Sequence, residues 1–544
     1  MLMKKVLFSL LATLAVSVLP AQTTSNTLWT ASLTPVSEAS QLGQTHVTVA
    51  ADSSVIVTGT YNQAFSFGSK SVANDDAMTS AYIAKYDKQG SALWIATLYG
   101  NAYVRDLTTD VKGNVYAVGA FADEVTCTGA DSKTTTITGM PNEQAVVTGF
   151  IAKLTADGAF SDIRTVYPTV DASISKSGLY DSESGDVKFL PQQVRVSDGK
   201  VYVVAQYTGN VKLDNMSWPG SYINVWDAMY MDLSSFGIMA LSADDLTGAT
   251  SVAYLQAKGA NDTNLTSAQE NPQSCRIAVD GSSVYAAFTG MGNEVLVTPN
   301  GKKDLALATS TTDDGTIYSC PVILAKVTDG TVDYSKVFYT KPNDKAAEYG
   351  TDKVSALTLE DGKLYVGGTF YGELGFNTSV TATGATDMYV AAVNAADFST
   401  LWAATDAFNE GATNNYDELV TGMAVVKGQA TLVGYSETKS DRTIVKPLQL
   451  TASSASDAKV TELTDSIVSL CDLGNGICAS IANKLTTTTV TVTSSAVNTG
   501  ISSIAAPTAV ADNKAYTLDG RFVGNATALP KGLYIIGKKK VVVR

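Results

Sequence analysis

The sequence is poor in the residues that most often carry catalysis. It has 544 residues but a single histidine, His46, so neither a Ser-His-Asp triad nor a metal site with several histidines can form. It also lacks GxSxG, HExxH and phosphate-binding glycine motifs, and we expect no cofactor and no metal. We interpret His46, which begins the first inner strand, as a structural residue.

Charged residues are also scarce, at 17% of the chain, and the net charge is −14. Residues 501–544 carry seven Lys or Arg against two Asp, so the rest of the chain is more acidic still. Because such a body would repel phosphates, we expect no nucleic-acid partner. The many Thr, Ser and Val residues favour an all-β protein with short strands.

Long apolar runs are missing except at the start of the chain. Residues 1–21 contain Lys4 and Lys5, then an apolar stretch that is short for a bilayer span, then small residues that end at Ala21. This order predicts a secretory signal peptide. We therefore expect Sec export, and a location outside the cell or at the outer-membrane surface.

Cysteines are few and odd in number: Cys127, Cys275, Cys320, Cys471 and Cys478. An odd number in an exported protein leaves at least one thiol unpaired within the chain. In CDLGNGIC, a turn at Gly474–Asn475 places Cys471 opposite Cys478, whereas a turn at Asn475–Gly476 places Cys471 opposite Ser480. In the first register, a disulfide between Cys471 and Cys478 and a pair of free thiols are both open alternatives.

What the chain does contain is a repeat with an irregular period. One seven-residue strand recurs after turns that carry Asp or Gly, residues that form tight turns. Its copies are SVIVTGT (54–60), NVYAVGA (114–120), KVYVVAQ (200–206), SVYAAFT (283–289), KLYVGGT (363–369), QATLVGY (429–435) and GICASIA (476–482). A strand precedes six of these copies, and a third and usually a fourth strand follow. Four antiparallel strands per unit predict the blades of a β-propeller.

The last unit lacks its fourth strand, and the chain begins with one. TTTTVTVTS (486–494) is the third strand of that unit, and NTLWTASLT (26–34) resembles the fourth strands of other units. An open ring would expose two strand edges. We therefore predict a monomeric, all-β, seven-bladed propeller over residues 22–500 that the N-terminal strand closes. Trp29, Trp94 and Trp402 should then occupy equivalent places in three blades.

The best repeats resemble a known family. DVKGNVYAVGAF (110–121), GFIAKLTADG (149–158) and AYIAKYDKQGSALW (81–94) are similar to SBBP-type repeats of seven-bladed propellers. That resemblance implies the fold and little about function, since such proteins are mostly uncharacterised exported or surface proteins. The quinoprotein-like propeller is the alternative, on ALSADDLTGA (240–249), although its second and third strands are joined by much shorter loops.

The end of the chain differs in composition. Residues 501–514 have the composition of a linker, and residues 515–544 resemble the C-terminal sorting domain of type IX secretion, which implies secretion or surface-attachment machinery as a partner. The residues that match are Tyr516, Gly520, Arg521, Val523, Pro530, Lys531, Gly532 and Tyr534. The alternative is a small β module that packs on the propeller.

Candidate binding residues lie in one insertion. In MSWPGSYINVWDAMYMDLSSF (216–236), Trp218, Tyr222, Trp226 and Tyr230 recur every four residues. They predict a recognition patch for glycans or proteins, or else the insertion's own core.

The long insertions share one place in the repeat. Residues 61–79, 122–147, 207–235, 290–318 and 371–386 all join second to third strands, which puts them on one face. We therefore expect a non-enzymatic scaffold that binds an extracellular protein or glycan. The alternative is a glycoside hydrolase, which facing carboxylates at the ring's centre would favour.

Overall fold

We analysed a computed structural model of the chain. It describes residues 26–35, 42–74, 78–139, 148–169, 188–226, 229–257, 274–289, 294–305, 309–312, 315–318, 322–338, 340–341, 353–376, 379–383, 386–405, 416–438, 443–464, 467–472, 476–483, 487–494, 514–516, 522–525, 532–536 and 539–543. All the secondary structure in these residues is β. The expected signal peptide, most of the linker, Gly520, Arg521, Pro530 and Lys531 lie outside them.

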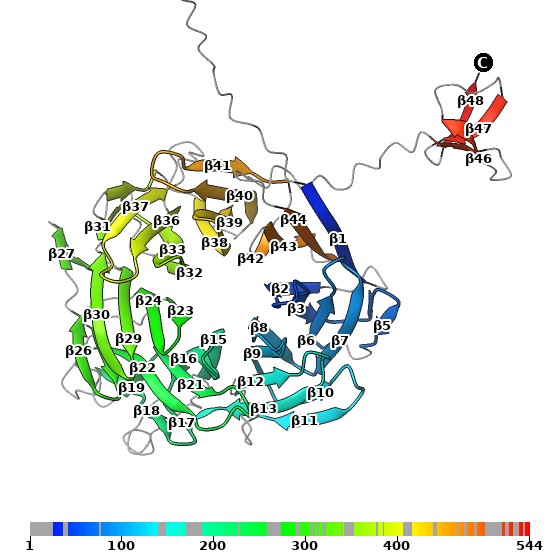
Figure 1. Cartoon of the computed structure of the whole chain (residues 1–544). Helices are drawn as coiled ribbons and strands as arrows, with labels where there is room; N and C mark the ends of the chain where they lie inside the picture. Colours follow the sequence, from blue (N-terminus) through cyan, green and yellow to red (C-terminus); the bar gives the residue numbers. More distant parts are fainter. Residues whose placement is uncertain are drawn as a thin grey trace, which may run out of the picture.

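The strands form four-stranded antiparallel blades arranged in a ring (Figure 1). From the inside outward, blade 1 is β2 (Leu42–Val49), β3 (Val55–Tyr61), β6 (Ser80–Tyr86) and β7 (Ala92–Tyr99); blade 2 is β8 (Ala102–Thr109), β9 (Val115–Phe121), β12 (Thr148–Leu154) and β13 (Phe160–Val166); blade 3 is β15 (Lys188–Ser197), β16 (Lys200–Thr208), β21 (Ser235–Ser242) and β22 (Thr250–Ala257); blade 4 is β23 (Ser274–Asp280), β24 (Ser283–Thr289), β29 (Val322–Thr328) and β30 (Thr331–Phe338).

The remaining blades complete the ring. Blade 5 is β32 (Lys353–Glu360), β33 (Lys363–Phe370), β36 (Asp387–Asn394) and β37 (Thr400–Thr405); blade 6 is β38 (Tyr416–Val426), β39 (Gln429–Thr438), β40 (Ile444–Ala452) and β41 (Lys459–Glu462); blade 7 is β42 (Ile467–Asp472), β43 (Gly476–Asn483), β44 (Thr487–Ser494) and β1 (Asn26–Pro35). The innermost strands contact one another in the order β2, β8, β15, β23, β32, β38, β42 and back to β2. The expected all-β propeller class is confirmed.

The second strand of each unit is apolar because neighbouring blades cover both of its faces. Every residue of β3 and of β9 is buried, and β33 is buried after its first residue. Gly119 and Gly368 lie beside bulges of the innermost strands. A Cβ atom at Gly119 would lie 2.0 Å from the Tyr103 carbonyl, and one at Gly368 would lie 1.8 Å from the Lys353 carbonyl. The glycines of these strands therefore permit the close approach of the innermost strand.

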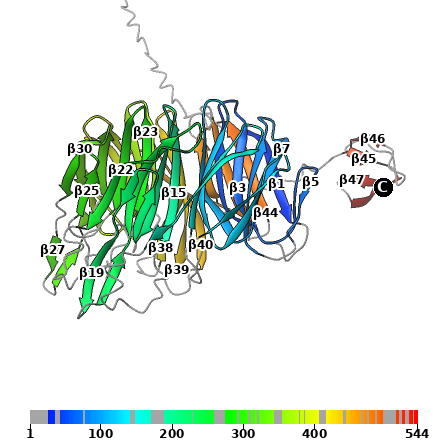
Figure 2. The ribbon, with the colours of Figure 1, turned by 90° about the horizontal axis from the view of Figure 1, so that it is seen from below.

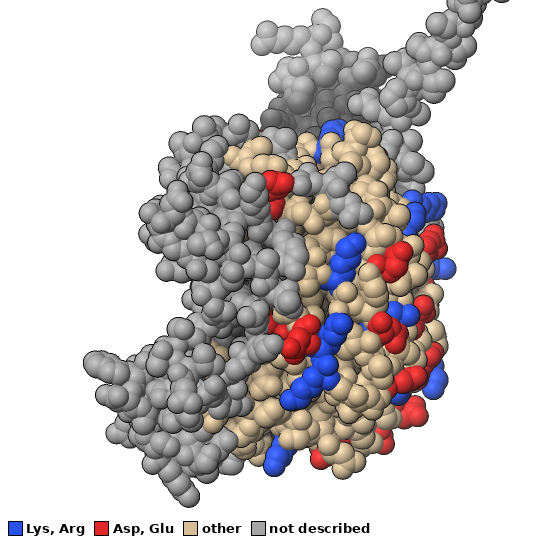
Figure 3. Space-filling model, turned by 90° about the vertical axis from the view of Figure 1, so that its left-hand side faces the viewer, with Lys and Arg blue, Asp and Glu red and all other residues tan. Residues whose placement is uncertain are grey.

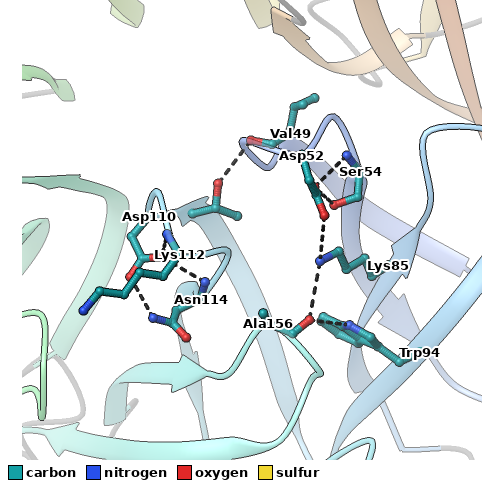
Figure 4. Close-up of polar contacts among 10 residues, drawn as sticks. Val49, Asp52, Ser54, Lys85, Trp94, Asp110, Lys112, Asn114 and Ala156 are labelled. Carbon is teal, nitrogen blue, oxygen red and sulfur yellow. Dashed lines mark hydrogen bonds and ion pairs between the residues drawn. The ribbon is translucent and has the colours of Figure 1, made fainter.

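The turn residues act as the repeat predicts. The Asp110 carboxylate accepts hydrogen bonds from the backbone nitrogens of Lys112 and Asn114, both at 2.9 Å (Figure 4). Asp198 and Asp361 have a positive φ of 48°, a conformation that Asp tolerates better than most residues. Asp110 therefore stabilises the tight turn between the first and second strands of its blade, and Asp198 and Asp361 occupy the positive-φ position of the corresponding turns.

The N-terminal strand closes the ring, as the sequence predicts. β1 pairs antiparallel with β44 over Asn26 to Leu33, with Trp29 opposite Val492. A one-residue bulge precedes Trp29, and the same bulge precedes Trp94 in blade 1 and Trp402 in blade 5. The three tryptophans therefore occupy equivalent places in their blades, which confirms that prediction.

The insertions between second and third strands extend the neighbouring blade. Each of five insertions supplies a hairpin that pairs with the outer edge of the preceding blade or with a short strand that follows it. The hairpin β4 (Phe65–Phe67) and β5 (Lys70–Val72) pairs with β1; β10 (Glu124–Thr128) and β11 (Thr134–Thr138) pair with β7; β17 (Asn210–Leu213) and β18 (Met216–Trp218) pair with β14 (Pro168–Thr169); β25 (Glu294–Thr298) and β26 (Gly301–Leu305) pair with β22; β34 (Glu373–Gly375) and β35 (Ser379–Thr381) pair with β31 (Thr340–Lys341). Each of these five hairpins therefore covers or extends a strand edge.

Two hairpins pair with no blade in the described residues. They are β19 (Ser221–Trp226) with β20 (Met229–Leu233), from the insertion of blade 3, and β27 (Thr309–Thr312) with β28 (Gly315–Tyr318), from that of blade 4. Figure 2 shows β19 and β27 beyond the body of the ring on the same face. We call them the projecting hairpins.

A separate small sheet lies near the C-terminus. Its strands are β45 (Lys514–Tyr516), β46 (Phe522–Asn525), β47 (Gly532–Ile536) and β48 (Lys539–Val543), in the order β46-β45-β47-β48 with antiparallel pairing. The expected C-terminal β module is therefore present. Tyr516, Val523, Gly532 and Tyr534 of the sorting pattern lie in its strands. Among the described residues, no helix could cross a membrane.

Candidate functional site

Polar side chains link the blades at the centre of the ring. The Asp106 carboxylate of β8 accepts a hydrogen bond from the Val194 nitrogen of β15 at 2.9 Å. The Gln193 amide oxygen of β15 in turn accepts one from the Ile277 nitrogen of β23 at 2.6 Å. Ser469 of β42 links the last blade to the first, because its hydroxyl accepts a hydrogen bond from the Val47 nitrogen of β2 at 3.2 Å. Polar residues on the innermost strands therefore join consecutive blades.

Three arginines lie on the innermost strands of consecutive blades. Arg105 is on β8, Arg195 on β15 and Arg276 on β23, and these strands contact one another in that order. We call them the arginine cluster. All three side chains are half-buried, so solvent reaches them although they lie on the inner wall of the ring.

One carboxylate pairs with the arginine cluster in the described residues. Asp106 lies 2.8 Å from Nη1 of Arg195, and their side chains are 19% and 33% exposed. Arg276 instead donates to two backbone carbonyls, those of Ser355 and Cys275, both at 2.8 Å. The positive charge of Arg276 therefore has no direct carboxylate partner there.

Arg105 is the least constrained of the three. It is the extra residue of the β8 bulge between Val104 and Asp106. Its Nε is buried and has no hydrogen-bond partner in the described part of the chain, and its guanidinium carbon lies 5.8 Å from the centre of the Tyr103 ring. Nε of Arg105 is thus a donor without an acceptor in the described part of the chain.

The single histidine lies within the field of these charges. Burial lowers the pKa of His46 below its ordinary value, the charge of Asp106 raises it, and the charges of Arg105 and Arg276 lower it further. Burial also lowers the pKa of Arg276, and the positive charges of Arg105 and Arg195 lower it further. His46 is therefore neutral at pH 7 and adds no charge to the cluster.

One carboxylate of the innermost strands, outside the arginine cluster, is held by the backbone of a neighbouring blade. Glu418, on the innermost strand of blade 6, is buried and accepts a hydrogen bond from the Met388 nitrogen at 2.9 Å, which is a structural role. Among the described residues, no group of three or more His, Cys, Asp and Glu could hold a metal ion. The hydrolase alternative stays a prediction.

Trp218 is not part of an exposed recognition patch, which corrects that prediction. It is completely buried, and its ring lies 5.1 Å from that of Tyr207 and 6.5 Å from that of Phe189. Its indole nitrogen donates to the Ser251 hydroxyl at 2.9 Å. Trp218 fills space above Gly237, where a Cβ atom would lie 2.5 Å from it. It therefore belongs to the core of blade 3.

The other three aromatics of the patch lie in a projecting hairpin. Tyr222 is half-buried on β19, opposite Asp232 of β20. Trp226 pairs with Met229 and Tyr230 pairs with Asn224 in the same hairpin, and their side chains lie outside the description. The four aromatics spaced four apart thus lie in three different strands, β18, β19 and β20. A recognition role for Tyr222, Trp226 and Tyr230 stays a prediction.

The strands β42 and β43 adopt the first of the two registers that the sequence leaves open. Cys471 of β42 lies opposite Cys478 of β43, yet Cys471 is a free thiol here. Burial raises its pKa to about 11. Cys127 and Cys275 are buried free thiols, and burial raises the pKa of Cys127 to about 12. Cys320 lies outside the described residues.

Surface charge marks no patch on the side of the ring that Figure 3 shows. Basic and acidic side chains are interspersed over the described surface of that side. That side therefore presents no large electrostatic field of one sign that would attract a charged ligand.

The comparisons with known proteins concern the fold. No family model and no curated protein matches the chain, so the resemblances to SBBP-type repeats and to the sorting domain stay predictions. Among solved structures, a protein of unknown function from Dyadobacter fermentans is 10% identical with a TM-score of 0.38, and covers 86% of this chain and 99% of its own. The C-terminal WD40 domain of Sif2 is 9% identical with a TM-score of 0.36, and covers 87% and 99%. These scores are low, and the sheet topology carries the fold assignment.

The arginine cluster was missed in the sequence, although a signal exists. Arg105, Arg195 and Arg276 each lie three to five residues before the turn of their unit, in YVRDLTTD, VRVSD and CRIAVD. A basic residue in the first strand of three consecutive units is that signal. In the blade register Arg276 is level with Asp106 and Gln193, whereas Arg195 lies two residues nearer the turn, and the contacts between blades that bring the three together are not visible in the sequence.

Proposed function

We propose that the chain is an exported scaffold that binds an extracellular protein or glycan through its projecting hairpins. The observation that carries this is the contrast between the insertions. Five hairpins extend neighbouring blades or the short strands that follow them, whereas β19–β20 and β27–β28 pair with no other strand among the described residues and lie beyond the ring on one face (Figure 2).

A rigid ring is a suitable support for such hairpins. Loops held by a stable framework carry recognition in many folds, and aromatic side chains supply much of the contact energy at interfaces. The hairpin β19–β20 contains Tyr222, Trp226 and Tyr230. This composition supports glycan or protein binding.

Export is part of the proposal. Residues 1–21 have the features of a signal peptide, and residues 515–544 resemble a type IX sorting domain. Deletion of residues 515–544, tested in a host with type IX secretion, should keep the protein from the cell surface and the medium. Unchanged surface protein, measured by protease accessibility on whole cells, would contradict this role of the tail.

The binding test removes one hairpin. Ser221 and Leu233 are paired across β19 and β20, so an Asn-Gly turn can replace residues 222–232. A glycan array with the purified chain should lose its signals in this variant at an unchanged melting temperature. The control is Val111→Ser, at an 89% exposed residue in a tight turn of blade 2 on the opposite face. Equal signals from the wild type and the hairpin deletion would contradict the proposal.

A further inference from the structure

The arginine cluster is assembled by contacts that tie its members together. Arg105 immediately precedes Asp106, whose carboxylate binds both the Arg195 side chain and the Val194 nitrogen. Arg276 immediately precedes Ile277, whose nitrogen binds Gln193, two residues before Arg195. The same blade-to-blade links that hold the ring therefore bring three guanidinium groups to one region of its inner wall.

The positive charge of this region exceeds the negative charge. Asp106 is the only carboxylate bonded to the cluster within the described residues, and it pairs with Arg195. His46 is neutral there, so it neither adds to nor offsets the excess. Arg105 and Arg276 thus carry two charges without a direct counterion, in a chain whose net charge is −14. An excess of like charge on a partly enclosed wall is unfavourable without a counterion.

The hydrogen-bond donors of the cluster are not all used. Nε of Arg105 is buried and has no partner in the described part of the chain. Nε and Nη1 of Arg276 donate to backbone carbonyls, which leaves its charge uncompensated. Guanidinium groups bind the oxygens of carboxylate, sulfate and phosphate groups in a fixed, often bidentate geometry.

We propose that the arginine cluster is a binding site for a small oxyanion, the carboxylate, sulfate or phosphate group of a soluble ligand that reaches the inner wall of the ring. Arg105 and Arg276 supply the uncompensated charge, and Arg195 is held in place by Asp106. This site is separate from the projecting hairpins, and it does not depend on the function proposed for them.

His46 provides a direct readout, because it is the single histidine of the chain. The charges of Arg105 and Arg276 act on its pKa and lower it. A bound oxyanion offsets those charges, so the pKa of His46 should rise. The full chain is titrated with sodium sulfate, phosphate or acetate at a constant ionic strength set with sodium chloride. The Cε1 proton signal of His46 then reports the pKa of the imidazole at each oxyanion concentration.

The expected result is a saturable shift of the His46 signal and a higher pKa with at least one of these oxyanions, and no such shift with chloride alone. The order of affinity distinguishes tetrahedral sulfate and phosphate from planar acetate. The absence of a saturable shift with all three oxyanions, up to about 50 mM, would overturn the proposal, since even weak sites of this kind bind in the millimolar range.

The variants separate the site from a general charge effect. Arg105→Gln removes a guanidinium that makes no hydrogen bond within the described residues, so folding should be unaffected. Oxyanion affinity should fall roughly tenfold or more, as for a lost charge-assisted bond. Arg276→Lys, which keeps the charge, should weaken binding less. Lys133→Gln removes the same charge from an 87% exposed side chain and should bind like the wild type.

Either of two outcomes of the variant series would contradict the assignment of the arginine cluster as an oxyanion site. Arg105→Gln could bind with unchanged affinity, or Lys133→Gln could lose as much as Arg105→Gln. The deletion of residues 222–232 should leave the oxyanion titration unchanged, so failure of the hairpin proposal and failure of this one are distinguishable.

Discussion

The indole nitrogen of Trp29, in the first strand of the chain, donates a hydrogen bond to the backbone carbonyl of Lys88, 3.0 Å away, in the next blade. Trp94 of blade 1 makes the same bond to Ala156 of blade 2, also at 3.0 Å (Figure 4). Each tryptophan therefore covers the turn between the third and fourth strands of the following blade. The joint that closes the ring is built like an ordinary contact between blades.

Substitution of Trp29 should weaken the closure of the ring. Trp29→Ala removes the bond to Lys88 and a half-buried ring, 5.8 Å from that of Tyr86, and should cost about 2 kcal/mol of the free energy of unfolding. Urea denaturation measures the loss. Leu28→Ala is the control, because Leu28 is 61% exposed in the adjoining bulge, and it should cost far less. Equal losses for the two variants would contradict the role of Trp29.

Gly90 should be intolerant of a side chain for two separable reasons. Its φ is +86°, and a Cβ atom would lie 2.7 Å from the Trp29 ring. Gly199 has a φ of +70° with nothing within 4 Å of such an atom. Gly199→Ala therefore measures the backbone strain alone, about 1 kcal/mol, and Gly90→Ala should cost more.

The excess cost of Gly90→Ala should depend on Trp29. In a Trp29→Ala background the indole ring is absent, so Gly90→Ala should cost no more than Gly199→Ala. This double-mutant cycle isolates the contact. An excess that persists without Trp29 would mean that another neighbour causes the strain.

Trp218 should behave as a core residue. Trp218→Ala should lower the free energy of unfolding by about 3–5 kcal/mol, because it leaves a cavity and an unpaired Ser251 hydroxyl. Tyr222→Ala, at a half-buried position of the projecting hairpin, should cost less. Thermal unfolding compares the two variants. A Trp218→Ala variant with an unchanged melting temperature and weaker glycan binding would restore the recognition role.

What the sequence could predict depends on how local the signal is. The Asp110 turn and the recurring Leu-Trp pair of the fourth strands leave patterns within a few residues of the chain, and the missing fourth strand shows as an incomplete last repeat. The burial of Trp218 and the arrangement of Arg105, Arg195 and Arg276 depend on contacts between different blades or insertions. The regular spacing of aromatic residues therefore located Trp218 in an aromatic segment, but it could not show that the indole of Trp218 faces the protein core.

The ion pair of Arg164 and Asp214 links blades 2 and 3 and should make stability depend on pH. The Arg164 guanidinium lies 2.5 Å from Oδ1 of Asp214, and Oδ2 accepts a hydrogen bond from the Ala249 nitrogen at 3.0 Å. The bond from Ala249, and then Arg164, hold the pKa of Asp214 below its ordinary value of 3.8. A carboxyl whose pKa is lower in the folded state stabilises the protein above its unfolded pKa, and this contribution is lost as the pH falls through the folded value.

Asp214→Asn should therefore destabilise the protein at pH 7 and much less below pH 3. Asn is the suitable replacement, because Asp214 has a φ of +50° and Asn tolerates that conformation. The loss at pH 7 should be about 1 kcal/mol, measured by urea denaturation across pH 2–8. Asp157→Asn is the control, at an exposed residue with no hydrogen bond or ion pair in the described chain, and it should change little at pH 7. A loss for Asp214→Asn that is the same at pH 2.5 and pH 7 would show that the charge of Asp214 does not stabilise this contact between blades.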